Sequence, residues 1–185
     1  MGGRGGPKWP TNADVINEQP LTGLQWRKVY GHDNDGGYFA NLEEAKKKNI
    51  DDENSKLFSR LYDLESMRDN DGMFHFKLCH PERTEEDFPC NEWKQSSNPV
   101  VESEVTGFVG IRLTWPLRSD GKPFGGLMKS SPRWNLIDDD PSWFWWNSIG
   151  TISAYPHGGI PGPVATGPTH IQVKKKELFV LSISY

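Results

Sequence analysis

Residues 73–79, MFHFKLC, decide the fold class of this chain, because apolar and polar side chains alternate along them. The apolar residues fall on one face of an extended chain and the others on the opposite face: Phe74, Phe76 and Leu78 against His75, Lys77 and Cys79. A period of two is typical of an antiparallel strand that is buried on one side only. The stretch therefore predicts a strand with its phenylalanine face against the core.

Extended patterns continue on both sides of this strand. Two of them predict a shared face for a set of side chains: Leu24, Trp26, Lys28 and Tyr30 in LQWRKVY, and Val109, Ile111, Leu113 and Trp115 in VGIRLTW. Three more strands are expected in RWNLI, WFWWNSIGTISAY and KELFVLSIS, whereas the segment PHGGIPGPVATGP is expected to be a loop. Short strands that follow one another predict a mainly β protein, an antiparallel β-sandwich that resembles a jelly roll.

Two short helices are expected towards the N-terminal side. In NLEEAKKKN, Asn41 is a suitable N-cap and Glu44 stands three residues later, which is the capping-box spacing. A second helix is expected within residues 51–67, where Leu57, Leu61 and Leu64 recur at helical spacing. This leucine stripe predicts a core contact.

Length and charge limit the organisation and the partners. A chain of 185 residues with 35% hydrophobic content can bury one core, so we expect a flexible Gly/Pro-rich arm over residues 1–20 and a single domain over 21–185. The net charge is −4 and the basic residues are scattered, so nucleic acid is not an expected partner. The longest aliphatic run, residues 178–181, is too short to cross a membrane, and a soluble protein is expected.

Two cysteines bracket the loop HPERTEEDFPC, in which two prolines turn the chain back. A disulfide between Cys79 and Cys90 would add about 3 kcal/mol of stability in an oxidising compartment. Two free buried thiols are one alternative. A zinc site that adds His75 and His80 is another, although the paired C-x-x-C spacing of such sites is missing.

Several of these segments together are similar to a known module. They are GGYF, KLFSRLYDLES, DGMFHFKLCHPE, CNEWKQSSNP, VTGF, NLIDDDP, WWNSIG and IPGP…ELFVL. The set resembles a module that recurs in predicted secreted proteins of marine invertebrates, and the likeness runs from about Trp26 to Val180. Its members occur in extracellular, matrix-type or lectin-like contexts, and no biochemical activity is settled for them. The resemblance implies an extracellular location, although the chain shows no apolar stretch typical of a signal peptide.

No motif of an enzyme class accompanies the five histidines. The chain has no G-x-S-x-G elbow, no H-E-x-x-H helix and no phosphate loop. A cysteine nucleophile would need a free thiol close to a histidine, and the adjacent Cys79 and His80 would point to opposite faces of a strand. A non-catalytic function is therefore predicted, with an uncharacterised enzyme as the less favoured alternative.

The segment PSWFWWNSIG carries more large rings than one strand face needs. Such rings suit the apolar faces of sugars, or a protein partner, when polar side chains stand nearby. The opposite interpretation is that the rings fill the core, and Trp93 in CNEWKQ has the same ambiguity. The predicted ligand-binding residues are Trp143, Trp145, Asn147, Arg133, Asp139 and Asp140, and the predicted ligand is a glycan or an extracellular matrix protein.

A structural role is the alternative function. The N-terminal arm cannot form much core alone, and such arms can order against another copy or another matrix protein. The chain would then belong to an extracellular or skeletal, biomineral-type matrix without sugar binding. Glycan affinity discriminates between the two functions.

The motif DNDG occurs twice, at residues 33–36 and 69–72, and invites a calcium assignment. Neither copy has the EF-hand ligands, because Leu42 and Leu78 fall where the glutamate at position 12 should be. No cofactor is predicted, but a calcium site of another type at Asp33 and Asp35 stays open, as does one in the acidic run at residues 138–140. Both copies are better explained as turns at a change of period.

Overall fold

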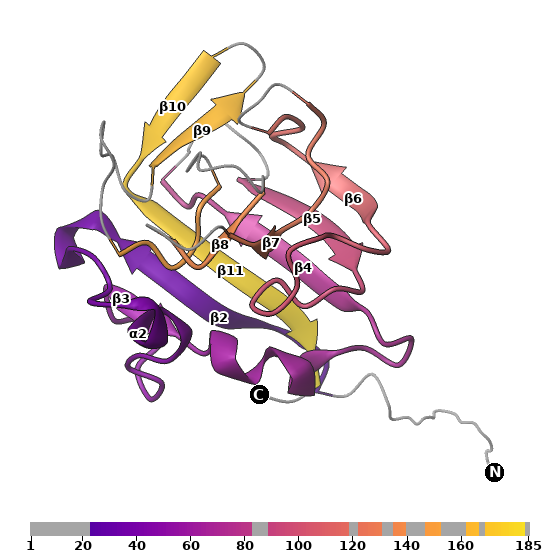
Figure 1. Ribbon diagram of the computed structural model, residues 1–185, viewed down its shortest axis with the longest axis horizontal. Helices are drawn as coiled ribbons and strands as arrows, with labels where there is room; N and C mark the ends of the chain where they lie inside the picture. Colours follow the sequence, from indigo (N-terminus) through magenta and orange to yellow (C-terminus); the bar gives the residue numbers. More distant parts are fainter. Residues whose placement is uncertain are drawn as a thin grey trace.

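The computed structural model describes residues 23–82, 89–118, 122–130, 135–139, 147–152, 162–166 and 169–183, with the backbone alone described over 162–172. Within these ranges the protein is mainly β, as predicted, with two short helices on the N-terminal side (Figure 1). The strands are β2 Gln25–Asp33, β3 Leu57–Ser59, β4 Phe74–Cys79, β5 Cys90–Gln95, β6 Val109–Leu113, β7 Met128–Lys129, β8 Ile137–Asp138, β9 Gly162–Thr166, β10 Thr169–Val173 and β11 Lys175–Ser182. The helical elements are η1 Asn34–Gly36, α2 Leu42–Lys46 and η2 Leu61–Met67.

Six strands form one antiparallel sheet in the order β3-β2-β11-β4-β5-β6. The last strand of the chain, β11, lies in the middle and pairs with β2 on one side and β4 on the other (Figure 1). The sheet therefore joins the two ends of the described chain. Arg27 reinforces this closure by donating from Nη2 to the carbonyl oxygens of Gly23 and Ile183, at 2.9 and 3.1 Å.

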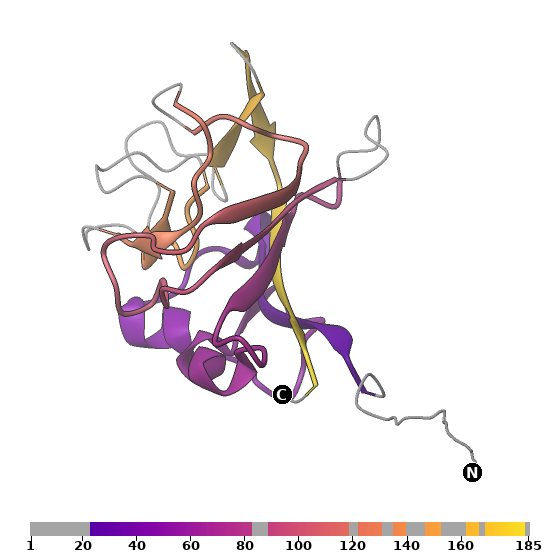
Figure 2. The ribbon, with the colours of Figure 1, turned by 90° about the vertical axis from the view of Figure 1, so that its right-hand side faces the viewer.

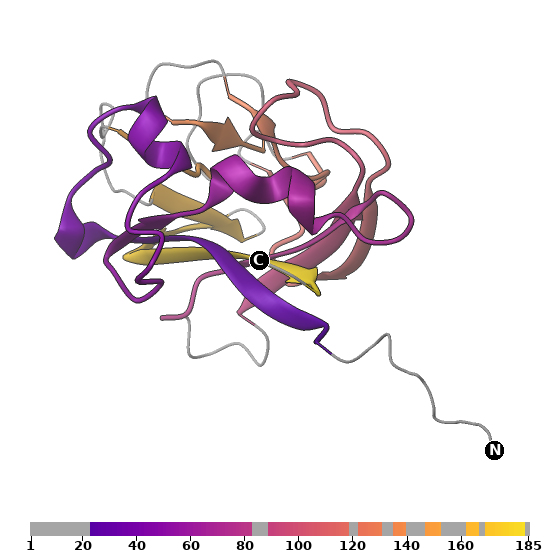
Figure 3. The same ribbon diagram turned by 90° about the horizontal axis from the view of Figure 1, so that it is seen from below.

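One face of the sheet is covered by a second layer. This layer contains α2, η2 and the short ribbon of β7 and β8, which lie on the same side of the sheet in Figures 2 and 3. The arrangement is sandwich-like, although helices and irregular segments supply much of the second layer. The hairpin of β9 and β10 stands beyond one end of the sheet and leads directly into β11 (Figure 1).

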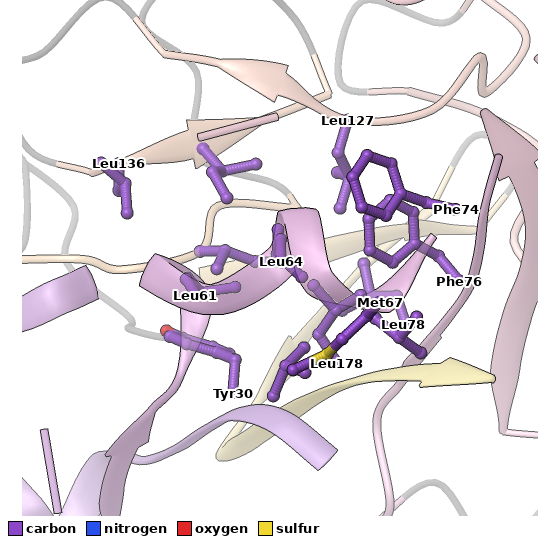
Figure 4. Packing of buried hydrophobic residues seen from close by; sticks show 14 of the residues in the cluster. Tyr30, Leu61, Leu64, Met67, Phe74, Phe76, Leu78, Leu127, Leu136 and Leu178 are labelled. Carbon is purple, nitrogen blue, oxygen red and sulfur yellow. The ribbon is translucent and has the colours of Figure 1, made fainter. Parts of the chain in front are cut away.

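The core lies between these layers and uses the face that residues 73–79 predict. Phe74, Phe76 and Leu78 are fully or almost fully buried and pack with Leu61 and Leu64 of η2 (Figure 4). Each buried aromatic or aliphatic side chain of this size contributes about 1.5–3 kcal/mol through its removal from water.

Trp93 belongs to the same core, so its ring fills the core and is not part of a binding surface. Its side chain is fully buried, and its ring lies 5.5 Å from that of Phe76. The indole N–H donates to Gln95 Oε1 at 2.8 Å, so burial leaves no polar atom of the ring unsatisfied.

The second predicted helix is only half right. Leu57 and Phe58 lie in β3, where Phe58 pairs with Gly31 of β2, and the helical turn η2 begins at Leu61. Strand pairing prevails before Leu61 because the edge of β2 offers backbone hydrogen-bonding groups that a helix would leave unpaired. The buried contact of Leu64 follows as predicted.

Two predicted strand faces are wrong for one shared reason. The pairing register of β2 shifts between Leu178 and Phe179 of its neighbour β11. The register of β6 shifts between Glu92 and Trp93 of its neighbour β5. A bulge adds a residue to one strand and reverses the alternation beyond it. In the first set Tyr30 is buried, whereas Leu24 is exposed. In the second set Trp115 is buried and Leu113 packs against the core, whereas Val109 and Ile111 are exposed.

The segment predicted as a loop over residues 156–168 contains a strand. β9 begins at Gly162 and pairs with β10. Pro163 is compatible with this pairing because β9 has a single neighbour in the described sheet order, and a strand at an edge tolerates a missing N–H.

The predicted disulfide is present. Cys79 and Cys90 are direct partners in the register of β4 and β5, and their sulfur atoms are 1.98 Å apart. Both thiols are thereby used, which overturns the free-thiol and zinc alternatives.

Local turn chemistry also follows the sequence. Asn41 Oδ1 accepts from the Glu44 N–H at 2.8 Å at the start of α2, as the capping box predicts. In both DNDG copies the first aspartate accepts from the N–H two residues later at 2.9 Å, Asp33 from Asp35 and Asp69 from Asp71. Both copies are turns, as predicted.

Candidate functional site

The predicted ligand-binding residues fall into two groups. Trp143, Trp145, Arg133 and Asp140 lie outside the described residues. Asp139 and Asn147 are described, and the structure brings them together: Asn147 Nδ2 donates to Asp139 Oδ2 at 2.8 Å. Both side chains are buried, at 1% and 2% exposure, so they do not form the exposed polar rim that the sequence predicts.

This hydrogen bond joins the two ends of the aromatic segment 140–146. Next to it, Ile137 and Ile149 exchange two backbone hydrogen bonds of 3.0 and 2.9 Å in an antiparallel bridge. Leu136, Ile137 and Ile149 are buried in the main core. The residues on the two sides of 140–146 therefore lie together in the core, and we call residues 136–139 and 147–150 the 139/147 base.

Two buried side chains of the main sheet hold the returning chain. Lys176 of β11 donates from Nζ to the Ser148 carbonyl oxygen at 2.9 Å. The hydroxyl oxygen of Tyr30, on β2, accepts from the Gly150 N–H at 2.9 Å. These two strands are neighbours in the sheet, so two buried side chains tie the base to the main sheet.

The base is built from ionisable groups that burial drives towards their neutral forms. Burial lowers the pKa of the Lys176 amine to about 7, although the charges of Asp138 and Asp139 act in the opposite direction. Burial, together with the neighbouring Asp139, raises the pKa of the Asp138 carboxyl well above its ordinary value. Asp138 Oδ1 also accepts from the Asp139 N–H at 2.8 Å, which fixes the turn that leads into the segment.

A hydrogen-bonded chain connects this base to the first DNDG turn. His32 Nε2 lies 2.7 Å from the Gly37 carbonyl oxygen, and because a carbonyl only accepts, Nε2 carries the proton. Nδ1 is then the acceptor for the Tyr30 hydroxyl at 3.2 Å. Burial lowers the pKa of His32 to about 4, which matches this neutral tautomer, and burial raises the pKa of Tyr30.

Sequence reasoning missed Lys176, His32 and Tyr30 as members of the site. One signal was available for Lys176, because a period of two in KELFVLSIS puts it on the face of Leu178 and Val180, which points into the core. No comparable signal identifies its contact with Ser148, since the two residues are 28 positions apart.

The aspartates considered for calcium are engaged with lysines. Asp35 Oδ2 lies 2.7 Å from Lys174 Nζ, and Asp33 Oδ2 lies 3.8 Å from Lys175 Nζ. The small hollow beside Asp33 is also lined by Lys28, Lys56 and Glu177, and Lys28 pairs with Glu177 at 2.8 Å. Among the described residues, no group of three or more histidine, cysteine or acidic side chains is placed to hold a metal ion.

A groove of about 470 Å³ lies at the opposite end of the sheet, beside the second DNDG turn. Leu24, Leu181 and Ile183 line it together with residues 68–71. Two of the charged groups on its wall already have partners, since Arg68 pairs with Glu65 and Asp69 pairs with Lys94. The groove therefore offers fewer free polar groups than its composition indicates.

Comparison of the chain with protein-family models, with curated proteins and with solved structures found no match. Within the described ranges, no helix has the length and apolar character needed to span a membrane. The proposal for function therefore rests on the residues themselves.

Proposed function

We propose that this protein is a non-catalytic extracellular recognition module that binds glycans, or a matrix protein, through the aromatic segment 140–146. The observation that carries this proposal is the hydrogen bond between Asp139 and Asn147, which clamps the two ends of that segment. Recognition surfaces work best when their anchors are held on a rigid scaffold, because less conformational entropy is then lost on binding.

The composition of the clamped segment supports a stacking ligand. Its seven residues, DPSWFWW, include four aromatic rings. Aromatic rings give large contact areas with few rotatable bonds, and their faces match the C–H faces of sugars. The cystine at residues 79 and 90 is in keeping with an oxidising, extracellular location.

The buried base has a positioning role in this proposal. Asp139 and Asn147 do not contact the ligand; they fix the distance between the ends of the segment. Arg133 and Asp140 stay predictions for direct polar contacts, together with Trp143 and Trp145 for stacking.

A glycan array probed with the full chain tests the proposal. We expect binding to at least one glycan class, with Trp143→Ala or Trp145→Ala weakening it by roughly tenfold or more, as for aromatic anchors in other interfaces. Trp26→Ala is the matched control, because this half-buried tryptophan of β2 contacts His75 on the main sheet, away from the base. Binding that survives both segment variants unchanged, or an array without any bound glycan together with no captured matrix protein, would contradict it.

A further inference from the structure

The face of the main sheet that points away from the core carries an apolar stripe. The helices α2 and η2 and the β7–β8 ribbon lie over the opposite face, and no described helix or strand covers this one (Figures 2 and 3). Leu178 and Val180 of β11 are buried in the core, so the residues that alternate with them point the other way. The apolar stripe consists of Leu24, Trp26, Phe179, Leu181 and Ile183.

Strand pairing holds the middle of the stripe together. Trp26 of β2 is the direct partner of Leu181 of β11. Lys77 of β4 places its Nζ 4.4 Å from the centre of the Trp26 ring and 5.1 Å from that of the Phe179 ring. These side chains are half-buried by one another, so the most accessible part of the stripe lies at its end.

That end is the groove of about 470 Å³ beside the second DNDG turn. Leu24 and Ile183 belong to its apolar wall and are 39% and 62% exposed. On the polar wall, the side chains of Asn70 and Asp71 make no hydrogen bond or ion pair within the described part of the chain. An apolar wall facing an unpaired carboxylate suits an aromatic side chain that stands next to a basic one.

Residues 1–22 precede the described chain and contain a pair of this kind. Lys8 and Trp9 are adjacent, with a proline on each side, and no acidic residue occurs before Asp14. Prolines favour an extended chain, which reduces the conformational entropy that is lost on binding. The charge of Lys8 also complements that of the Asp71 carboxylate in the groove.

The connection between this pair and the groove has a suitable length. Residues 10–22 join Trp9 to Gly23. Arg27 donates to the carbonyl oxygens of both Gly23 and Ile183, so the described chain begins at the wall of the groove. A random coil of about thirteen residues has a root-mean-square span of about 20 Å and keeps its two ends at a local concentration in the millimolar range.

The other end of the chain is too short to cover the stripe. Residues 184 and 185 span at most about 7 Å, whereas the stripe runs roughly 13 Å along β11 from Phe179 to Ile183. We therefore propose that Lys8 and Trp9 dock in the groove of their own chain, with the indole on the apolar wall and the ammonium near Asp71. This docking does not depend on the recognition function proposed above.

Limited trypsin digestion of the full chain, followed by intact mass measurement, tests this docking. The rate of cleavage after Lys8 reports the undocked population, because proteolysis follows the accessible form. We expect Ile183→Ser to raise this rate by roughly threefold or more through the lost apolar contact. Asp71→Asn should raise it by roughly twofold through the lost charge. Both sites are exposed, so circular dichroism should show an unchanged fold.

Val101→Ser is the matched control, because Val101 is 66% exposed and does not line the groove. It should leave the cleavage rate after Lys8 at the wild-type value. Methyl NMR of the full chain gives a second measurement that needs no protease. A docked indole should shift the Ile183 methyl signals upfield through its ring current, and Trp9→Ala should remove this shift while the Val101 methyl signals stay in place.

Three results would overturn the inference. The first is an equal rate of cleavage after Lys8 in the wild type and in both groove variants. The second is a set of Ile183 methyl signals that Trp9→Ala does not move. The third is protection of Lys8 that grows as the protein concentration rises from about 5 to 500 μM, because it would place the pair in the groove of a second copy.

Discussion

Asn147 donates a hydrogen bond of 2.8 Å to the carboxylate of Asp139, and this contact closes the base of the aromatic segment between them. Asn147→Ala should lower the free energy of unfolding by about 2 kcal/mol, because a buried carboxylate oxygen loses a donor. Urea denaturation measures the change, and Asn54→Ala, at an exposed asparagine, should alter it by less than about 0.5 kcal/mol.

The same variant separates a positioning role from a merely stabilising one. If the base positions the segment, Asn147→Ala should also speed hydrogen exchange in residues 140–146 at temperatures where the protein stays folded. Unchanged exchange in that segment would argue against the positioning role.

Lys176 makes stability depend on pH. Its pKa is about 7 in the folded protein against an ordinary value of 10.5. Between these two values the unfolded chain binds the extra proton, so the free energy of unfolding should rise with pH, by up to about 1.4 kcal/mol per pH unit. Below pH 7 both states are protonated and this contribution is constant.

Lys176→Met removes this titration while keeping an unbranched side chain of similar length. The free energy of unfolding of the variant should therefore change less between pH 7 and about pH 9.5 than that of the wild type. Lys56→Met, at an exposed lysine, should keep the wild-type slope. Parallel curves for wild type and Lys176→Met would show that the amine does not titrate in this range.

Gly150 combines a backbone requirement with close packing. Its φ is +72°, and a Cβ at this position would lie 2.8 Å from Leu136 Cβ and 3.1 Å from Ala45 Cβ. Gly72 has a similar φ of +77° but no atom within 4 Å of such a Cβ. Gly72→Ala should therefore cost about 1 kcal/mol for backbone strain alone, and Gly150→Ala about 2–4 kcal/mol because overpacking is added. Equal melting temperatures for the two variants would contradict this difference.

The cystine joins neighbouring strands of the sheet at a sequence separation of 11. Replacing both residues, as Cys79→Ser with Cys90→Ser, should lower the free energy of unfolding by about 3 kcal/mol, mainly because the unfolded chain gains freedom. A reducing agent should destabilise the wild type by a similar amount and leave the double variant unchanged. An effect of the reductant on the double variant would point to another cause.

Calcium can be tested by thermal melting in excess calcium and in chelator. We expect the same melting temperature in both, because Asp33 and Asp35 already contact lysines. A melting temperature that rises with calcium, and no longer does so in Asp35→Asn, would instead establish a site at the first DNDG turn.

Features that depend on residues close along the chain can be predicted from the sequence. The alternation in residues 73–79 predicts β4 and its buried face, Asn41 with Glu44 predicts the start of α2, and the spacing of the two cysteines suits a closed loop. Each of these follows from local geometry, because the interacting groups are close along the chain or share one element.

The faces that strands present to the core, and the places where polar residues lie, depend on contacts between distant parts of the chain. The bulges in β2 and β6 depend on the partner strand, so a single-strand pattern cannot show that Ile111 is exposed. Likewise, the sequence predicts Asp139 and Asn147 at the surface, whereas both are buried. Lys176 and Tyr30 of the main sheet hold residues 148–150 beside them. Buried polar groups must find partners, and those partners come from distant parts of the chain that only folding brings together.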